Sequence, residues 1–374
     1  MFMPNKLTAF ALACSAVFGQ EPLDPKTAIK FDLPKDSPVA IQALDPGDSK
    51  TYTQGGARVL DIHTALTLRN IGGKKIQAVT LLVRSQEKTP GGKASVSVAS
   101  VNANPNESFP VRIDLRLLRP IAAGAGPLLE VQLDGILFDD LSFYGENRLN
   151  SHRSMVQWEL EARRDRKYFR QILESKGADG LRAEMIACLG RQDTRPQLNV
   201  QMVRDGGRAT NVTGEKQVEF SFLRLPDSPI DPLAGSATVL ANEAKSPSVD
   251  VRNTSGRAVR YLEVGWIVRD RDGKEYYGGS TPAEVTLNPG GRSRVVDHSA
   301  LKFSGKSGQP LVIDGITGFV NHVEFADGGA WVPARTSLAE PRIAGVMAAS
   351  AEEQRLVQLY RKKGLQAVVQ SLTK

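Results

Sequence analysis

One pattern of residues occurs twice in this chain, with the second copy about 183 to 187 residues after the first. In the first copy, an alternating apolar run ends at 66–70 and is followed by a glycine turn and a further apolar run. In the second copy, the same order of features starts at residues 249–253. Solenoid repeats have periods of roughly 20–50 residues, so this much longer period indicates a duplicated domain with small loop insertions. Further matches, in the same order, pair 104–105 with 288–289, 138–140 with 325–327, and 176–177 with 363–364.

Alternating apolar residues predict β-strands in both copies. Apolar positions alternate over 60–68 in the first copy and over 262–268 in the second, which is the spacing of strands with one buried face. The offset places Trp266 at the position of Val83, so both are expected in the core. Asp272-Gly273 then marks a hairpin, because a type I′ turn needs positive φ at both central residues.

Short strands that are separated by turns, without intervening helices, are typical of antiparallel β-sandwiches. The strand spacing, with Trp266 in a central strand, resembles immunoglobulin-like and fibronectin-like modules, although the cysteine pair of antibody domains is missing. This resemblance is generic and implies architecture only.

Helical patterns follow each predicted sandwich. Ser154 can cap a helix that Lys176-Gly177 interrupts, and Ser350 with Glu353 forms a capping box ahead of the break at Lys363-Gly364. The expected fold is therefore mainly β with accessory α. It comprises two immunoglobulin-like or fibronectin-like antiparallel β-sandwiches, each followed by a helical hairpin, as an internal duplication.

The expected domain organisation follows from these patterns and from two irregular segments. One segment is proline-containing with little periodicity, and the other is rich in Arg, Asn, Gly and Thr, as connectors are. The expected boundaries are 1–19 for a signal peptide, 20–35 for a leader segment, 36–150 for the first β-sandwich, 151–190 for the first helical hairpin, 191–217 for a connector, 218–340 for the second β-sandwich and 341–374 for the C-terminal helical hairpin.

The first residues have the features of an export signal. Lys6 gives a basic start, and the apolar run over 7–18 is too short to span a bilayer. Small residues predict cleavage near Gly19, so we expect an exported protein, periplasmic or secreted. The alternative is a lipoprotein anchored through Cys14, although Leu12 lies one position too late for a good lipidation motif. No later stretch is apolar enough for a transmembrane helix.

Cysteine content excludes internal disulfides from the exported chain. Cys14 would be removed with the signal, which leaves Cys188 alone. Stability must then come from buried cores. Because Cys188 lies in an apolar helical run, we expect it to be buried and the protein to be monomeric.

No complete catalytic or metal-binding motif occurs in the sequence. Asp270, Asp272 and Glu275 lack the spacing of an EF-hand, and residues 304–307 lack the earlier glycine of a phosphate-binding loop. The histidines show no zinc spacing, and each is expected to be solvated or locally hydrogen-bonded. We therefore expect no catalytic residue, no cofactor and no metal. The histidines are His63, His152, His298 and His322.

Four basic residues share one stripe of the first predicted helix and form the candidate partner-binding surface. Glu159 and Glu174 lie four residues from the ends of this stripe and can neutralise part of its charge. Export and the lack of interleaved aromatic residues argue against nucleic acid as a partner. An envelope protein or an anionic polymer fits better. The four residues are Arg163, Arg166, Lys167 and Arg170.

The expected function is that of an exported, non-catalytic binding or scaffolding protein of the cell envelope. Sandwich modules often carry binding loops, which is an analogy at the level of fold. Tyr276, Tyr277 and Trp331 could stack on sugars, but aromatic residues make up only 6% of the chain. The alternative is a hydrolase of envelope or extracellular polymers, which would need two converging carboxylates in a cleft.

Overall fold

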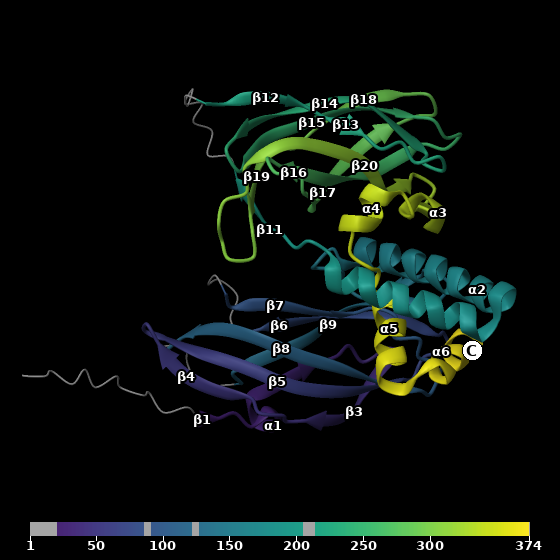
Figure 1. The fold of residues 1–374 in the computed structure, drawn as a ribbon. Helices are drawn as coiled ribbons and strands as arrows, with labels where there is room; N and C mark the ends of the chain where they lie inside the picture. The colour runs from purple at the N-terminus through teal and green to yellow at the C-terminus, as the bar shows by residue number, and fades with distance from the viewer. Residues whose placement is uncertain (1–20, 86–90, 122–126, 205–213, 374) are drawn as a thin grey trace, which may run out of the picture. The chain divides into compact units, whose positions relative to one another are not determined.

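The computed structural model describes residues 21–373, except 86–90, 122–126 and 205–213. The chain forms two compact units, residues 1–152 and 153–374, and each is described by itself (Figure 1). Antiparallel sheets dominate both units, and helices are few. The expected class, mainly β with accessory α in a sandwich-like layout, is confirmed. The expected signal peptide over 1–19 lies outside the described residues.

The first unit contains two five-stranded sheets around one apolar core. Its elements are β1 (Glu21–Pro22), α1 (Pro25–Ala28), β2 (Ile29–Asp32), β3 (Val39–Asp45), β4 (Lys50–Gln54), β5 (Ala57–Asn70), β6 (Ile76–Arg84), β7 (Lys93–Val98), β8 (Ser108–Pro120), β9 (Leu129–Phe138) and β10 (Phe143–Tyr144). One sheet has the order β1-β4-β5-β3, with β8 also paired to β5. The other has the order β10-β9-β6-β7, with β2 added in parallel to β9.

The second unit combines another pair of sheets with all the longer helices. Its strands are β11 (Asn199–Arg204), β12 (Lys216–Glu219), β13 (Ser221–Phe222), β14 (Ile230–Leu240), β15 (Glu243–Asn253), β16 (Val259–Asp270), β17 (Glu275–Leu287), β18 (Arg292–Val296), β19 (Ser299–Ser304), β20 (Ile313–Phe325) and β21 (Ala330–Trp331). The sheets have the orders β11-β19-β15-β14-β12, with β18 on β15, and β13-β20-β16-β17, with β21 on β20. The helices are α2 (Ser151–Thr194), α3 (Arg335–Leu338), α4 (Pro341–Val346), α5 (Ala351–Lys363) and α6 (Leu365–Thr373).

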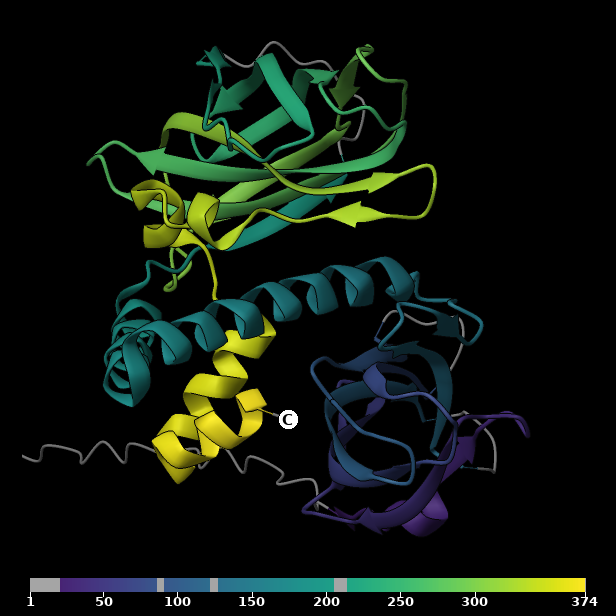
Figure 2. The same ribbon diagram turned by 90° about the vertical axis from the view of Figure 1, so that its right-hand side faces the viewer.

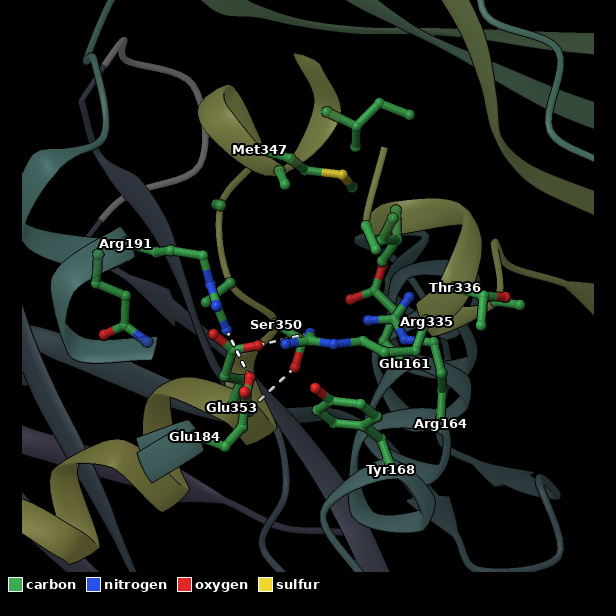
Figure 3. Close-up of a pocket in the computed structure, with 18 of the residues that line it drawn as sticks. Glu161, Arg164, Tyr168, Glu184, Arg191, Arg335, Thr336, Met347, Ser350 and Glu353 are labelled. Atoms are coloured by element: carbon green, nitrogen blue, oxygen red, sulfur yellow. Dashed lines mark hydrogen bonds and ion pairs between the residues drawn. The ribbon is translucent and has the colours of Figure 1, made fainter. Parts of the chain in front are cut away.

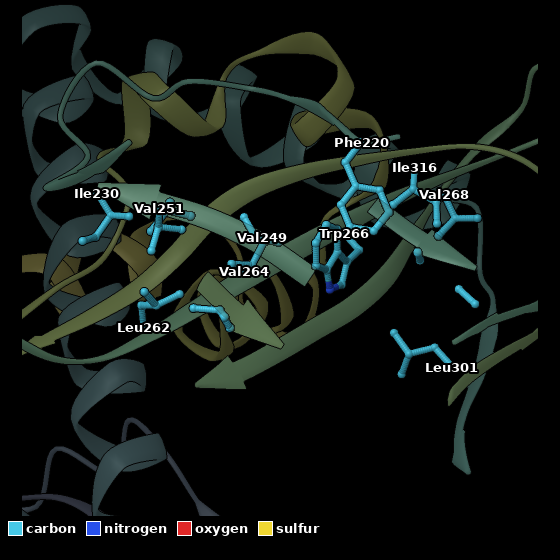
Figure 4. Packing of buried hydrophobic residues seen from close by; sticks show 14 of the residues in the cluster. Phe220, Ile230, Val249, Val251, Leu262, Val264, Trp266, Val268, Leu301 and Ile316 are labelled. Carbon is cyan, nitrogen blue, oxygen red and sulfur yellow. The ribbon is translucent and has the colours of Figure 1, made fainter. Parts of the chain in front are cut away.

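Trp266 lies in the core of the second unit, as the alternation of β16 predicted (Figure 4). Its indole Nε1 donates a hydrogen bond of 2.8 Å to Thr281 Oγ1, which satisfies the one polar atom of the ring. Across the ladder it faces Gly318, where a Cβ would come within 2.9 Å of the indole. The missing side chain on β20 therefore makes room for the large ring.

Corresponding contacts recur in the two sandwiches. Asn70 and Asn253 are both fully buried. The side-chain amide of each donates to two backbone carbonyl oxygens at 2.8–3.1 Å. One of these carbonyls lies four residues later in the chain, and the other lies 33 residues after Asn70 or 34 residues after Asn253. Each asparagine also accepts from a backbone N–H two residues later at 3.0 Å. The strand orders β10-β9-β6-β7 and β21-β20-β16-β17 match as well. These features agree with an internal duplication, which stays a prediction.

Two segments that were expected to be irregular contain strands. Within the expected leader over 20–35, β2 pairs with β9 and extends the first sandwich. Within the expected connector over 191–217, β11 pairs with β19 at a sheet edge. Ile29 of β2 is buried in the first core and Val200 of β11 packs against the second, but strands this short show too little apolar alternation to be predicted. Of the connector, 205–213 lies outside the described residues.

The helices also differ from expectation in two respects. The expected first hairpin, from Arg153 onward, belongs to the second compact unit rather than to the first. Helix α3 lies within the expected second β-sandwich and α4 at the start of the expected C-terminal hairpin, and no sequence pattern predicted either helix. None of the helices in the described part of the chain is long and apolar enough to cross a membrane.

Candidate functional site

Helices α2, α5 and α6 of the second unit (Figures 1 and 2) pack around one apolar cluster. Helix α2 breaks at Gly177, which has a positive φ of 67°, so its two halves fold back on each other as a hairpin. Phe169 and Leu181, one from each half, are fully buried against Leu356 of α5 and Val368 of α6. The two predicted hairpins are therefore one packed helical body.

Helix α4 is held on the outer side of the sheet that contains β16 and β20. Its Ile343 and Val346 are buried against Ile267 and Phe319. Arg342 of α4 donates to the Glu275 carboxylate at 2.6–3.1 Å and to Thr317 Oγ1 at 2.8 Å. This combination of an apolar contact and a bidentate ion pair fixes the helix on the sheet.

A pocket of about 780 Å³ lies between the α2 hairpin and the α3–α4 segment (Figure 3). Its size falls in the range of about 300–1,000 Å³ that is usual for small-molecule sites. The α2 hairpin supplies a polar wall, and the α3–α4 segment supplies a largely apolar one. The polar wall contains Glu161, Arg164, Lys167, Tyr168, Gln171, Glu184, Arg191, Gln192 and Arg195. The apolar wall contains Leu338, Ala339, Ile343, Ala344, Met347 and Ala348.

An ion-pair network forms one side of the pocket. Arg335 donates to Glu353 at 2.6 Å and lies 3.5 Å from the fully buried Asp165. Asp165 also accepts from Arg164 at 2.9 and 3.1 Å and from Ser350 at 2.6 Å. The carboxylates of Asp165 and Glu353 hold Arg164 and Arg335 in fixed geometry, because each guanidinium already has an acid partner.

Arg191 forms a second neutralised pair at the end of the hairpin. It donates to Glu184 at 2.8 Å and contacts the Sγ of Cys188 at 3.0 Å. Cys188 is fully buried, as its apolar run predicted, and burial raises the pKa of its thiol. The thiol therefore stays protonated at neutral pH and is a poor nucleophile.

Two cations of the pocket have no acid partner. Lys167 and Arg195 both line it, and among the described residues neither forms an ion pair. In contrast, the other three basic residues of the lining are each matched by a carboxylate, as given above. The pocket therefore carries an excess of positive charge at Lys167 and Arg195.

Glu161, in the polar wall of the pocket, has a displaced protonation equilibrium. Burial raises its pKa, while Arg164 and a 3.3 Å hydrogen bond from Gln157 act in the opposite direction. The nearby carboxylates of Asp165 and Glu263 raise it further. Glu161 thus holds its proton more readily than an ordinary glutamate does.

The predicted basic stripe does not form one open cationic surface. Arg163 and Arg166 both donate to Glu159, at 2.9 and 2.8 Å, and this carboxylate is buried. The side chain of Arg166 is only 15% exposed and lies 3.7 Å from the buried Glu352. Arg170 is exposed, and Lys167 lines the pocket. Of the four candidates, the structure brings only Lys167 to the pocket.

Sequence reasoning missed most of the pocket. Arg164, Lys167, Tyr168 and Gln171 have the i, i+3, i+4, i+7 spacing of one helix face, which is a signal that could have identified the polar wall. Nothing local connects these residues with Arg335 or with the apolar wall.

Of the histidines, His63 lies in the expected environment and His322 does not. His63 contacts the carboxylate of Asp114 at 3.2 Å, and this contact raises the pKa of His63. His322 corrects the expectation of a solvated or locally bonded ring, since it is fully buried in β20. Its ring lies 5.7 Å from that of Tyr261, and neither nitrogen has a hydrogen-bond partner among the described residues. The burial comes from the tertiary structure, which no local pattern encodes.

No metal site is evident in the residues that the structure covers, since no three His, Cys, Asp or Glu side chains are grouped to hold an ion.

Comparison with known proteins does not place the chain in a family. No family model matches it, and no curated protein does. Among solved structures, a β-glucosidase from Kluyveromyces marxianus is 8% identical over 71% of this chain and 45% of its own, with a TM-score of 0.16. A red sea bream transglutaminase is 10% identical over 76% of this chain and 31% of its own, with a TM-score of 0.12. The chain thus spans less than half the length of either protein.

Proposed function

We propose that the chain is an exported, non-catalytic binding protein of the cell envelope, and that its second unit holds a small ligand in the pocket beside the α2 hairpin. The observation that supports this proposal is that the two walls of the pocket differ in chemistry. One wall is apolar, and the other carries Lys167 and Arg195 in excess over the acids. Such a combination suits recognition, because apolar surface provides affinity and a few polar groups fix orientation.

Binding is favoured over catalysis by the state of the groups in the pocket. Glu184 and Glu353 each accept a hydrogen bond from an arginine, so both carboxylates already have a charged partner within the protein. The Cys188 thiol is buried and protonated. Rigidly paired charges of this kind stabilise a binding surface without supplying an acid, a base or a nucleophile.

Export is inferred from residues 1–19 alone. The basic start, the short apolar run and the small residues at 17–19 support cleavage near Gly19, and a monomer without disulfides is the expected mature form. Mass spectrometry of the exported protein should give an N-terminus near Gln20. An N-terminus at Met1, or a diacylated Cys14, would contradict this part of the proposal.

The binding function can be tested by filling the pocket. Ala344→Trp places an indole in the apolar wall, and Ala348→Trp does so at an exposed position of the same lining. A mixed library of small anions, neutral compounds and sugars should contain binders, measured by ligand-observed NMR, whose signals are lost with both variants. A library without any binder that these variants affect would refute the binding function.

Hydrolysis is the second candidate, and Glu161 is the observation in its favour. A carboxyl whose pKa is raised by burial, in a pocket, has the character of a general acid. In a hydrolase, Glu161→Gln should abolish turnover of an envelope or extracellular polymer while ligand binding persists. In the binding protein that we propose, purified wild-type protein turns over no such polymer.

A further inference from the structure

We propose that the ligand is a small amphiphilic anion, with one carboxylate or phosphate head at Lys167 and Arg195 and an aliphatic body against the α3–α4 wall. This inference rests on the binding function proposed above and names its ligand class. The argument comes from the charge, the chemistry of the walls and the size of the pocket.

The charge of the pocket indicates that the head group of the ligand is an anion. Arg164, Arg191 and Arg335 are bound to Asp165, Glu184 and Glu353, respectively. An anion that approached them would have to displace these carboxylates. Lys167 and Arg195 have no such competitor among the described residues, so they are the groups that gain a partner when an anion binds.

The position of the two cations supports a single shared head. Lys167 lies in the first half of α2 and Arg195 directly after the second, and both line the same pocket. Two unpaired like charges around one pocket repel each other, and an anion would remove this repulsion.

The apolar wall of the pocket indicates the chemistry of the aliphatic body of the ligand. Leu338, Ile343 and Met347 each pack on the sheet side and also line the pocket. Figure 3 shows Met347 across the pocket from the ion-pair network of Arg335 and Glu353. The unbranched, polarisable side chain of methionine adapts to chains of varied shape. Each CH₂ group that leaves water for this wall is stabilised by the hydrophobic effect, so an aliphatic body would add affinity.

The volume limits the size of the ligand. About 780 Å³ accommodates a small molecule, and a polymer could enter only with its end. The amphiphile can therefore be a free fatty acid-like molecule or an alkyl phosphate, and the two differ only in the head.

The test is a titration of the full chain with four probes below their micelle concentrations: dodecanoate, dodecyl phosphate, dodecanol and acetate. We expect dodecanoate or dodecyl phosphate to bind, the tighter of the two identifying the head, while dodecanol and acetate bind at least tenfold more weakly. Lys167→Gln combined with Arg195→Gln should weaken the binding of the charged amphiphile by roughly 10- to 100-fold, the loss expected for one or two charge-assisted contacts.

The matched control is Lys362→Gln combined with Lys363→Gln, two exposed lysines of α5 outside the pocket, which should leave the affinity unchanged. Equal affinity for dodecanol, equal losses in both double variants, or binding that survives Ala344→Trp and Ala348→Trp would overturn the inference. If none of the four probes binds while other compounds bind in a manner that the tryptophan variants abolish, the ligand class is wrong and the binding function stands. Circular dichroism of each variant separates loss of binding from loss of the fold.

Discussion

At the scale of single residues, the environment of His322 disfavours the protonated form of its ring. His322 is fully buried without a hydrogen-bond partner among the described residues, and burial lowers its pKa to about 4. Glu324 opposes this shift, and Arg153, which stacks at 3.6 Å over the neighbouring Tyr261, adds to it. The folded protein therefore requires the neutral ring.

The protonation of His322 should make the second unit less stable in acid. Between an unfolded pKa of about 6.5 and the folded value of about 4, the unfolded chain binds more protons, so stability falls as pH falls through this window. The full effect is about 3 kcal/mol. His322→Phe should flatten the decline of the melting temperature between pH 6.5 and 4 relative to wild type. Parallel declines in the two proteins would show that His322 is not responsible.

Trp266 places a large buried ring in the core of the second unit. Trp266→Ala should lower the free energy of unfolding by about 3–5 kcal/mol, because it removes a large buried ring and leaves the Thr281 hydroxyl without its donor. Chemical denaturation of the full chain measures this, with the transition of the second unit followed separately. Trp266→Phe, which keeps most of the ring volume, should cost less, and equal losses would contradict the packing argument.

At the scale of elements, two glycines make the helical hairpins. Gly177 has φ 67° and ψ −167°, and Gly364 has φ 77° and ψ −178°. This backbone region is essentially restricted to glycine. The same conformation at both breaks explains why a glycine occurs at each.

Substitution of these glycines should destabilise the helical body through the backbone alone. A Cβ at either position would meet nothing within 4 Å, so Gly177→Ala and Gly364→Ala should each cost about 1–3 kcal/mol from backbone strain. Gly190→Ala is the matched control in α2, where open space also surrounds the position and helix propensity predicts a gain of up to about 1 kcal/mol. Thermal melts compare the three, and a neutral Gly177→Ala would contradict the assigned conformation.

At the scale of the whole molecule, the position of the domain boundary is the main departure from expectation. The sequence predicts a unit that ends at 190, whereas the α2 hairpin packs with α5 and α6 in one cluster of the second unit. A fragment of 153–374 should therefore be soluble and unfold cooperatively. A fragment of 218–374 should melt at a lower temperature, because it exposes the apolar faces of α5 and α6. Equal melting temperatures would favour the boundary that the sequence predicts.

Local chemistry was enough to determine the strands with clear apolar alternation, their buried faces and the helix breaks, but not the short strands β2 and β11. A strand alternates with period two, so Val264, Trp266 and Val268 had to share a face, and a positive φ demands glycine at 177 and 364. The apolar run around Cys188 was likewise sufficient to predict its burial.

Only the tertiary structure decided the pocket, the burial of His322 and the fate of the basic stripe. Arg335 meets Asp165 across 170 positions of sequence. Glu159 pairs with Arg163 at the local i, i+4 spacing, but the burial of Glu159 and the contact of Arg166 with Glu352 come from the packing of the helices. Ion pairs and desolvation depend on distances in space, whereas periodicity reports only which face of an element is apolar. The sequence therefore determined the elements of this protein, and the packing of helices far apart in the chain determined which charges remain without a partner.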